Sequence, residues 1–116
     1  MLIPDHLNTY FYLPVVDFRK SINGLSVLVI ESMNLSLDSD QIYLFHNRRG
    51  DKLKALHYSH HCFSLVYCRL EKGKWILPKG DEGHLELSQS HLSWLLSSHQ
   101  YSRVDALKET VYQQFI

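Results

Sequence analysis

The sequence predicts a single α+β domain, an antiparallel β-meander of about four to six strands packed with two or three helices. Apolar residues alternate with a period of two across Gln41–Pro78, which is typical of strands. Before and after this region, apolar residues recur every three or four positions, as they do on one face of a helix. The length of 116 residues, 45% of them hydrophobic, suits one hydrophobic core over residues 1–116.

The first expected elements are a strand over Tyr10–Val16 and a helix over Phe18–Met33. Aromatic and β-branched residues favour the strand, but Pro14 restricts it to a sheet edge or to the strand's final turn. Asp17 stands at the N-cap position of the helix. The residues that would share one helical face are Phe18, Ile22, Leu25, Leu28, Val29 and Met33.

The region Gln41–Pro78 is expected to form four antiparallel strands. Turn residues stand at Asn47–Gly50, Ser59–His61 and Lys72–Gly73. A four-residue connection at the first turn would pair Phe45 with Lys52, Tyr43 with Lys54, Leu44 with Leu53 and Ile42 with Ala55. A loop over Ser59–Cys62 would pair Tyr58 with Phe63, Lys54 with Tyr67 and Lys52 with Arg69. One face of this sheet is then apolar, and the other combines aromatic and basic side chains.

The last turn would place Glu71 opposite Lys74 and Leu70 against Trp75, which we expect in the core. A short strand over His84–Leu87 and a helix capped by Ser88 should follow. The residues that follow this cap at helical spacing are His91, Leu92, Leu95 and Leu96. Residues 102–116 form a tail in which Val104, Leu107, Val111 and Phe115 have helical spacing, so a third helix or an ordered extension is expected.

The net charge of zero conceals a strongly basic middle. Residues 1–45 carry two basic and five acidic side chains, residues 46–79 carry eight and two, and residues 80–116 carry two and five. The three segments therefore have net charges of −3, +6 and −3. A polyanionic partner is consistent with the middle segment alone.

The basic hairpin after Leu44 is the densest functional signal. Arg48 and Arg49 at its tip and the lysines that follow could contact successive phosphates, and Tyr43, Tyr58 and Tyr67 could stack on bases. The alternative is a solvated hairpin whose charges protect an edge strand. Arg19 and Lys20 lie where a helix dipole disfavours positive charge, so either a function or simple solvation must explain them. The candidate nucleic-acid-binding residues are Arg19, Lys20, Arg48, Arg49, Lys52, Lys54, Tyr67 and Arg69.

Metal binding and catalysis are not expected. His57, His60, His61 and Cys62 surround one turn, but their spacing matches no zinc pattern. Cys62 and Cys68 would lie about 20 Å apart along a strand, so they cannot share one metal. The chain has no nucleophile elbow, phosphate-binding loop or metalloprotease motif. We therefore expect no catalytic residue, no metal and no cofactor.

Three blocks of the sequence resemble the TnpB-type accessory proteins of the insertion sequence 66 family of bacterial transposable elements. These blocks are Asp17–Leu25, Leu44–Leu56 and Arg69–Trp75 with Pro78. The resemblance covers about residues 4–96. Phe18 and Lys52 replace a methionine and an arginine of the family pattern, Cys68 replaces a lysine, and Ser59–Cys62 replaces an Asp-Gly-x-Gly turn. The chain is far too short to be one of the RNA-guided nucleases that share the TnpB label.

The resemblance implies an accessory factor for transposition, encoded beside a transposase. Together with the basic hairpin, it predicts binding to DNA, such as the ends of the element, chiefly through phosphates. The alternative is an adaptor that binds the transposase, or another protein of the element, without contacting DNA. The strand over Tyr10–Val16 could pair with a second copy, although Pro14 opposes a long ladder, so a homodimer stays open.

We also expect a cytoplasmic protein, associated with the nucleoid if it binds DNA, with no membrane partner. The first residues, Met1–Asp5, lack the basic and apolar segments of a signal peptide. No apolar run is longer than four residues, and a membrane-spanning helix needs about 20.

Overall fold

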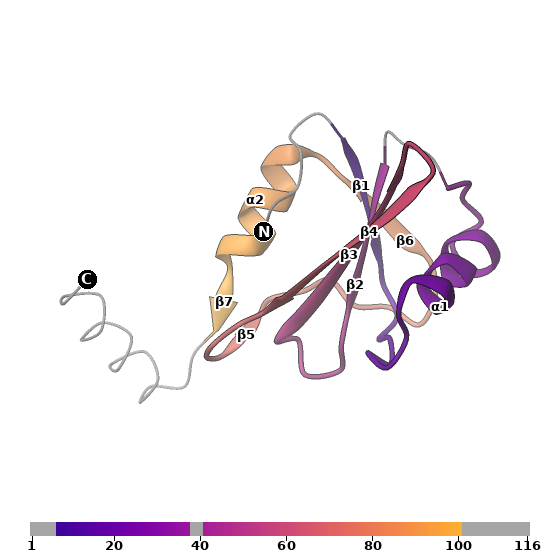
Figure 1. Ribbon diagram of the computed structural model, residues 1–116. Helices are drawn as coiled ribbons and strands as arrows, with labels where there is room; N and C mark the ends of the chain where they lie inside the picture. The colour runs from indigo at the N-terminus through magenta and orange to yellow at the C-terminus, as the bar shows by residue number, and fades with distance from the viewer. Residues whose placement is uncertain (1–6, 38–40, 101–116) are drawn as a thin grey trace.

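The computed structural model describes residues 7–37 and 41–100, and a five-stranded sheet lies at its centre (Figure 1). The strand order is β4-β3-β2-β1-β6, and every pair is antiparallel except β1 with β2. The strands are β1 Asn8–Tyr12, β2 Gln41–His46, β3 Lys52–Ser59, β4 Cys62–Arg69 and β6 His84–Leu87. Two short strands, β5 Lys74–Trp75 and β7 His99–Gln100, pair with each other outside this sheet.

Helical segments cover both faces of the sheet. Helix α1, Ile22–Val27, continues directly into the π-helical turn η1, Leu28–Ser32, on one face. Helix α2, Gln89–Ser97, lies on the other face beside β5 and β7 (Figure 1). The predicted α+β class is therefore confirmed.

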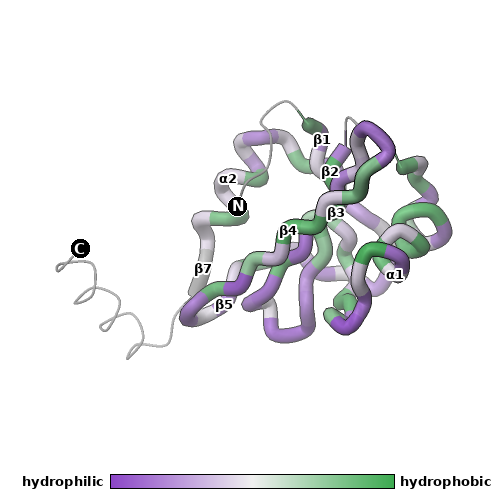
Figure 2. The backbone as a smooth tube through the Cα atoms, viewed as in Figure 1, coloured by the Kyte–Doolittle hydropathy of each residue, from purple (hydrophilic) through white to green (hydrophobic). Residues whose placement is uncertain are grey.

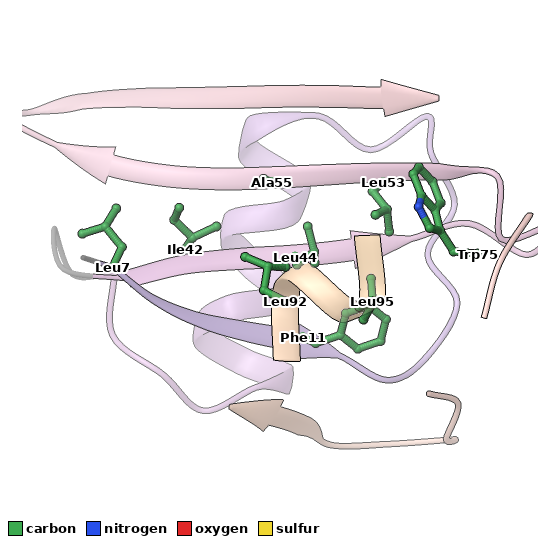
Figure 3. Close-up of a cluster of buried hydrophobic side chains, with 9 residues drawn as sticks. All are labelled: Leu7, Phe11, Ile42, Leu44, Leu53, Ala55, Trp75, Leu92 and Leu95. Carbon is green, nitrogen blue, oxygen red and sulfur yellow. The ribbon is translucent and has the colours of Figure 1, made fainter. Parts of the chain in front are cut away.

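The core is divided into two clusters because alternate residues of a strand point to opposite faces. Ile42 and Leu44 of β2 pack towards α2, whereas Tyr43 and Phe45 pack towards α1. The cluster on the α2 side contains Leu7, Phe11, Ile42, Leu44, Leu53, Ala55, Trp75, Leu92 and Leu95 (Figure 3). The cluster on the α1 side contains Tyr12, Val16, Leu25, Val29, Met33, Tyr43, Phe45 and Leu56. The face that we expected to present aromatic and basic side chains is thus partly covered by α1 and η1.

The predicted register is right between β3 and β4 and shifted by two residues between β2 and β3. Lys52 lies opposite Arg69 and Lys54 opposite Tyr67, as predicted. Lys54, however, lies opposite Phe45 and not opposite Tyr43. The connection has five residues, since the side-chain oxygen of Asn47 accepts hydrogen bonds from the backbone N–H groups of both Gly50 and Lys52. A shift of two residues leaves each side chain on its predicted face.

The prediction that a fourth strand of the meander follows β4 at the edge of the sheet is wrong. After β4 the chain turns towards the β2–β3 loop, where the Leu70 N–H donates to the Asp51 carbonyl and the Trp75 N–H to the Gly50 carbonyl. Lys74 therefore pairs with Gln100 of β7 and not with Glu71. These backbone bonds place β5 beside the basic loop rather than at the edge of the sheet.

Of the two alternatives for the first strand, the edge position is wrong, and Pro14 lies instead beyond the strand's end. β1 lies between β2 and β6 and pairs with both. Pro14 does not interfere, because the strand ends at Tyr12. No free edge of β1 is left for the pairing with a second copy that we considered.

The first helix begins four residues later than predicted. The Asp17 carboxylate accepts hydrogen bonds from the backbone and side chain of Arg19, which closes a turn instead of capping a helix. Ser21 occupies the N-cap of α1. The predicted apolar face is nevertheless correct, since Leu25, Val29 and Met33 are buried.

The core position of Trp75, the strand β6 and helix α2 follow the prediction, whereas β7 was not predicted. Trp75 is 5% exposed, and its indole N–H donates to the Leu96 carbonyl at 3.1 Å. β6 forms over the predicted residues, and the Ser88 hydroxyl accepts a hydrogen bond from the His91 N–H at 3.2 Å. The helix expected within residues 102–116 lies outside the described residues.

Candidate nucleic-acid interface

The β2–β3 loop presents two arginines from a fixed backbone. Arg48 and Arg49 are exposed at its tip. Asn47 binds the backbone of the loop, and its amide N–H donates to the Asp51 carboxylate at 2.7 Å. Gly50 is buried with a φ of +74°, a conformation that a side chain would strain. Figure 2 shows the loop as a hydrophilic stretch at the lower end of the molecule.

Lys52 and Arg69 continue the basic surface beside the loop. They lie directly opposite each other on β3 and β4, on the face that includes Lys54 and Tyr67. Like charges in this position destabilise a sheet. The stability of the sheet therefore does not explain why two cations stand opposite each other. Binding of an anionic ligand across both strands would explain it.

Lys54 is held inside the protein. Its ammonium donates to the carbonyls of Phe18 and Lys20 at 2.8 and 2.7 Å, and it lies 4.9 Å from the centre of the Phe18 ring. Lys54 is only 7% exposed, and burial lowers the pKa of its ammonium. The side chain anchors the segment before α1 to the sheet, so we leave it out of the residues that we propose for DNA.

The tyrosines differ in their access to a ligand. Tyr43 is fully buried, and its hydroxyl donates to the Ser36 carbonyl at 2.5 Å, so the stacking that we considered for it is wrong. Tyr67 is half exposed and packs edge-on against Phe18. Tyr58 contacts Phe63 at the far end of β3 and β4. Of these three tyrosines, Tyr67 keeps the most exposed surface near the basic loop, although the Lys54 ammonium lies 5.9 Å from the centre of its ring.

Arg19 and Lys20 precede α1 and do not belong to its first turn. The Arg19 guanidinium donates to the Asp17 carboxylate at 2.6 Å, and this pairing lowers the pKa of Asp17 to about 2. The pair is exposed, so its contribution to stability is small. Lys20 is exposed as well, but its backbone carbonyl holds Lys54. Arg19 is therefore already neutralised, and Lys20 remains as a flanking cation.

A pocket of about 460 Å³ lies beside the loop, and four cations line it. Arg48 and Arg49 come from the loop, and Lys74 and Lys79 come from β5 and the segment after it. None of the described residues that line the pocket is acidic. Sequence reasoning missed the two lysines, because it paired Lys74 with Glu71 in a hairpin; the cluster of basic residues at 72–79 was the available signal.

The floor of this pocket is formed by two buried rings, His46 and Trp75, which are 2% and 5% exposed. His46 Nε2 lies 2.8 Å from the Leu13 carbonyl, and the ring stacks on Phe11. Burial lowers the pKa of His46, and the positive charge of Lys79 adds to this effect. The His46 ring is therefore neutral at pH 7, and the positive charge of the pocket comes from its rim.

A second, apolar pocket of about 380 Å³ lies between α2 and the segment after β5. Its lining includes Ile76, Leu77, Leu87 and Trp94. Trp94 is 62% exposed, which is unusual for so large an apolar side chain. This surface has a different chemistry from the cationic pocket, although Ile76 and Leu77 line both.

Other kinds of site are not found in the described part of the chain. Across residues 7–37 and 41–100, no three histidine, cysteine or acidic side chains gather where they could hold a metal ion. Cys62 and Cys68 are free thiols on β4. Among the helices that the structure describes, none is long and apolar enough to cross a membrane.

Comparison with known proteins identifies the family. Residues 7–106 match the family described as IS66 Orf2 like protein. The chain belongs to the IS66 Orf2-like family. It is 32% identical over 89 residues to the uncharacterized protein y4jC of Sinorhizobium fredii. The aligned region covers 77% of this chain and 76% of the relative. The uncharacterized protein y4hO of the same organism is 28% identical over 81 residues, 70% of each chain. No solved structure matches.

The three sequence blocks that resemble the IS66 Orf2-like family surround the basic loop in the fold. Asp17–Leu25 forms the turn and helix that Lys54 anchors. Leu44–Leu56 contains the loop itself, and Arg69–Trp75 contains β5, which is bonded to the loop. Membership in this family associates the protein with transposition as an accessory protein of an insertion sequence.

Proposed function

We propose that this IS66 Orf2-like protein is a non-catalytic accessory factor that binds DNA of the insertion sequence through its phosphates. The proposed contacts come from a set that we call the basic end: Arg48, Arg49, Lys52, Arg69, Lys74 and Lys79. The observation that carries the proposal is their shared position around one loop. Backbone bonds from Leu70 and Trp75 to this loop bring the three segments together.

The charges of the basic end support binding to a polyanion. In the part of the chain that the structure describes, the one ion pair joins Asp17 and Arg19, so no described carboxylate forms an ion pair with the basic end. Phosphate contacts of this kind hold a protein on DNA without reading its sequence.

The salt dependence of DNA binding tests the proposal. If about five of the six side chains reach phosphates, the slope of log affinity against log salt concentration is about −4 to −5. Changing Arg48→Ala and Arg49→Ala together should flatten the slope by about two, and the matched variant Arg48→Lys with Arg49→Lys should retain it. A DNA affinity that changes neither with salt concentration nor on changing Arg48→Ala with Arg49→Ala would contradict the proposal.

The apolar pocket favours a second candidate function, an adaptor that binds the transposase of the same element. An exposed tryptophan beside a concave apolar surface is typical of an interface hot spot. Trp94→Ala should then weaken retention of the transposase in the presence of nuclease and leave DNA affinity unchanged. Loss of transposase retention on Arg48→Ala with Arg49→Ala, and not on Trp94→Ala, would assign the partner protein to the basic end instead.

A further inference from the structure

The pocket beside the loop combines features that a flat DNA surface does not need. We propose that it takes a single unpaired nucleotide, held by its phosphate at the cationic rim and by its sugar and base against the apolar wall. This inference rests on the proposed binding to DNA and deepens it. The shared chemistry of its ligands is a phosphate joined to an uncharged ring system, presented either by a single-stranded DNA end or by a free nucleotide.

The size of the pocket fits one nucleotide and excludes a duplex. A volume of about 460 Å³ lies within the range of small-molecule sites in proteins. Paired and stacked bases of a duplex cannot enter a concave site, so a nucleotide must be extruded or already unpaired to reach it. The pocket therefore selects for frayed, overhanging or single-stranded DNA.

The wall and the floor offer carbon surface. Val15 and Ile76 line the wall and are 43% and 45% exposed, which leaves apolar area facing solvent beside four cations. On the floor, Trp75 uses its only polar side-chain atom in the bond to Leu96, and Nε2 of His46 is bonded to Leu13. A ligand that was only a phosphate would leave this surface unused.

The rim supplies the charge from three directions. The loop contributes Arg48 and Arg49, β5 contributes Lys74, and the following segment contributes Lys79. The bond from the Trp75 N–H to the Gly50 carbonyl at 2.9 Å fixes the loop against β5, so the rim is formed before a ligand binds. A rim that is already positioned lowers the entropic cost of binding.

The test compares DNA ends with the same number of phosphates. Fluorescence anisotropy is measured at 0.1 M salt for a blunt duplex, a duplex with a single-stranded overhang, and a single strand. We expect the wild-type protein to bind the overhang at least ten-fold more tightly than the blunt end. Equal affinity for the two ends would overturn the inference, and it would leave the proposed contact with DNA phosphates intact.

Two matched pairs of variants assign the preference to the pocket. Val15→Gln removes apolar wall and should abolish the preference for the overhang, whereas Val27→Gln, at an exposed valine of α1, should retain it. Lys79→Gln should weaken overhang binding about five- to ten-fold, and Lys72→Gln, outside the pocket lining, should change it much less. Unchanged urea unfolding midpoints exclude misfolding as the cause. An overhang preference that survives both Val15→Gln and Lys79→Gln would overturn the inference.

Competition distinguishes the two sources of the nucleotide. Thymidine monophosphate that displaces the overhang from the wild-type protein but not from Val15→Gln identifies a free nucleotide as a ligand. Displacement by an unlabelled single strand alone identifies a DNA end. If Arg48→Ala with Arg49→Ala also fails to weaken any of the three DNA ligands, the proposed function fails together with the inference.

Discussion

Lys52 and Lys54 show how two lysines on one face of one strand acquire different roles. The Lys54 ammonium is bonded to two carbonyls of the segment before α1, whereas Lys52 is half-buried and lies opposite another cation. The sequence alone does not distinguish them, because both follow the same alternation. The distinction depends on where the turn after Asp17 packs, which is a tertiary feature.

Lys54→Met should destabilise the protein, and Lys52→Met should not. The first change leaves the carbonyls of Phe18 and Lys20 without their charged donor, which costs about 1.5–3 kcal/mol of unfolding free energy. The second removes a repulsion and should change stability by less than about 0.5 kcal/mol, while weakening DNA binding. Urea denaturation of both variants measures the difference. Equal stability of the two variants would contradict the anchoring role of Lys54.

His46 should make the protein less stable in mild acid. Burial lowers its pKa in the folded state, so between that value and the ordinary histidine value of about 6.5 the unfolded chain binds more protons. Stability is therefore fully present above about pH 6.5 and is lost as the pH falls below it. The thermal midpoint should fall between pH 7.5 and pH 5.5, and His46→Gln should reduce that fall. An identical pH profile for His46→Gln would exclude His46 as its source.

At the scale of elements, the β3–β4 hairpin was the most predictable part of the fold. Its two-residue turn fixes the register, and the pairs of Lys52 with Arg69 and Tyr58 with Phe63 follow directly. The β2–β3 register was less predictable because the bonds of Asn47 lengthen the connection, and the pairing is shifted by two residues. The place of β5 could not be predicted, since it depends on a partner, β7, about 25 residues later in the chain.

The candidate site, like the fold, could be predicted only in part. The exposed arginines of the loop were recognised from their turn, but Lys74 and Lys79 reach the pocket only because β5 folds back onto Gly50. The segment from Asp17 to Ser21 was misassigned because an aspartate before an apolar face can either cap a helix or close a turn. Here the Asp17 carboxylate accepts hydrogen bonds from Arg19, which stabilises the turn instead of a helix cap.

Replacing the β3–β4 turn should stabilise the protein. His60 and His61 have φ values of 52° and 61°, which suit the Asn-Gly turn of a type I′ hairpin better than two histidines. His60→Asn with His61→Gly should raise the unfolding free energy by about 1–2 kcal/mol. His61→Ala, which keeps a side chain at positive φ, is the control and should give no gain.

The same double variant should leave DNA binding unchanged. The turn lies at the opposite end of β3 from Lys52, about 23 Å away at the rise of an extended strand. A loss of DNA affinity in His60→Asn with His61→Gly would show that the histidine turn belongs to the interface.

At the scale of the whole molecule, the basic residues are concentrated in one region, and the order of strands in the sheet differs from their order in the sequence. The sheet places an early strand, β1, between a middle strand and a late one, and the residues of the basic end gather around the β2–β3 loop. An uneven charge distribution of this kind accelerates the approach of a polyanion. The net charge of zero is therefore compatible with the proposed binding to DNA.

Amide hydrogen exchange should reveal the interior place of β1. Its central residues, Thr9, Tyr10 and Phe11, pair on both sides, so their amides should exchange as slowly as those of β2 and more slowly than those of the outer strands β4 and β6. Mass spectrometry of peptides covering these strands measures the order. Rapid exchange over β1 would contradict the strand order of the sheet.

The position of β1 also constrains how the chain can fold while it is being synthesised. One of its partners, β2, emerges about 30 residues after it, but the other, β6, emerges more than 70 residues after it. Until His84–Leu87 has left the ribosome, one side of β1 has no partner, and Leu92 and Leu95 have not yet covered Phe11. The sheet is therefore completed only when most of the chain is available, and until then the unpaired edge of β1 is a site at which another strand could pair.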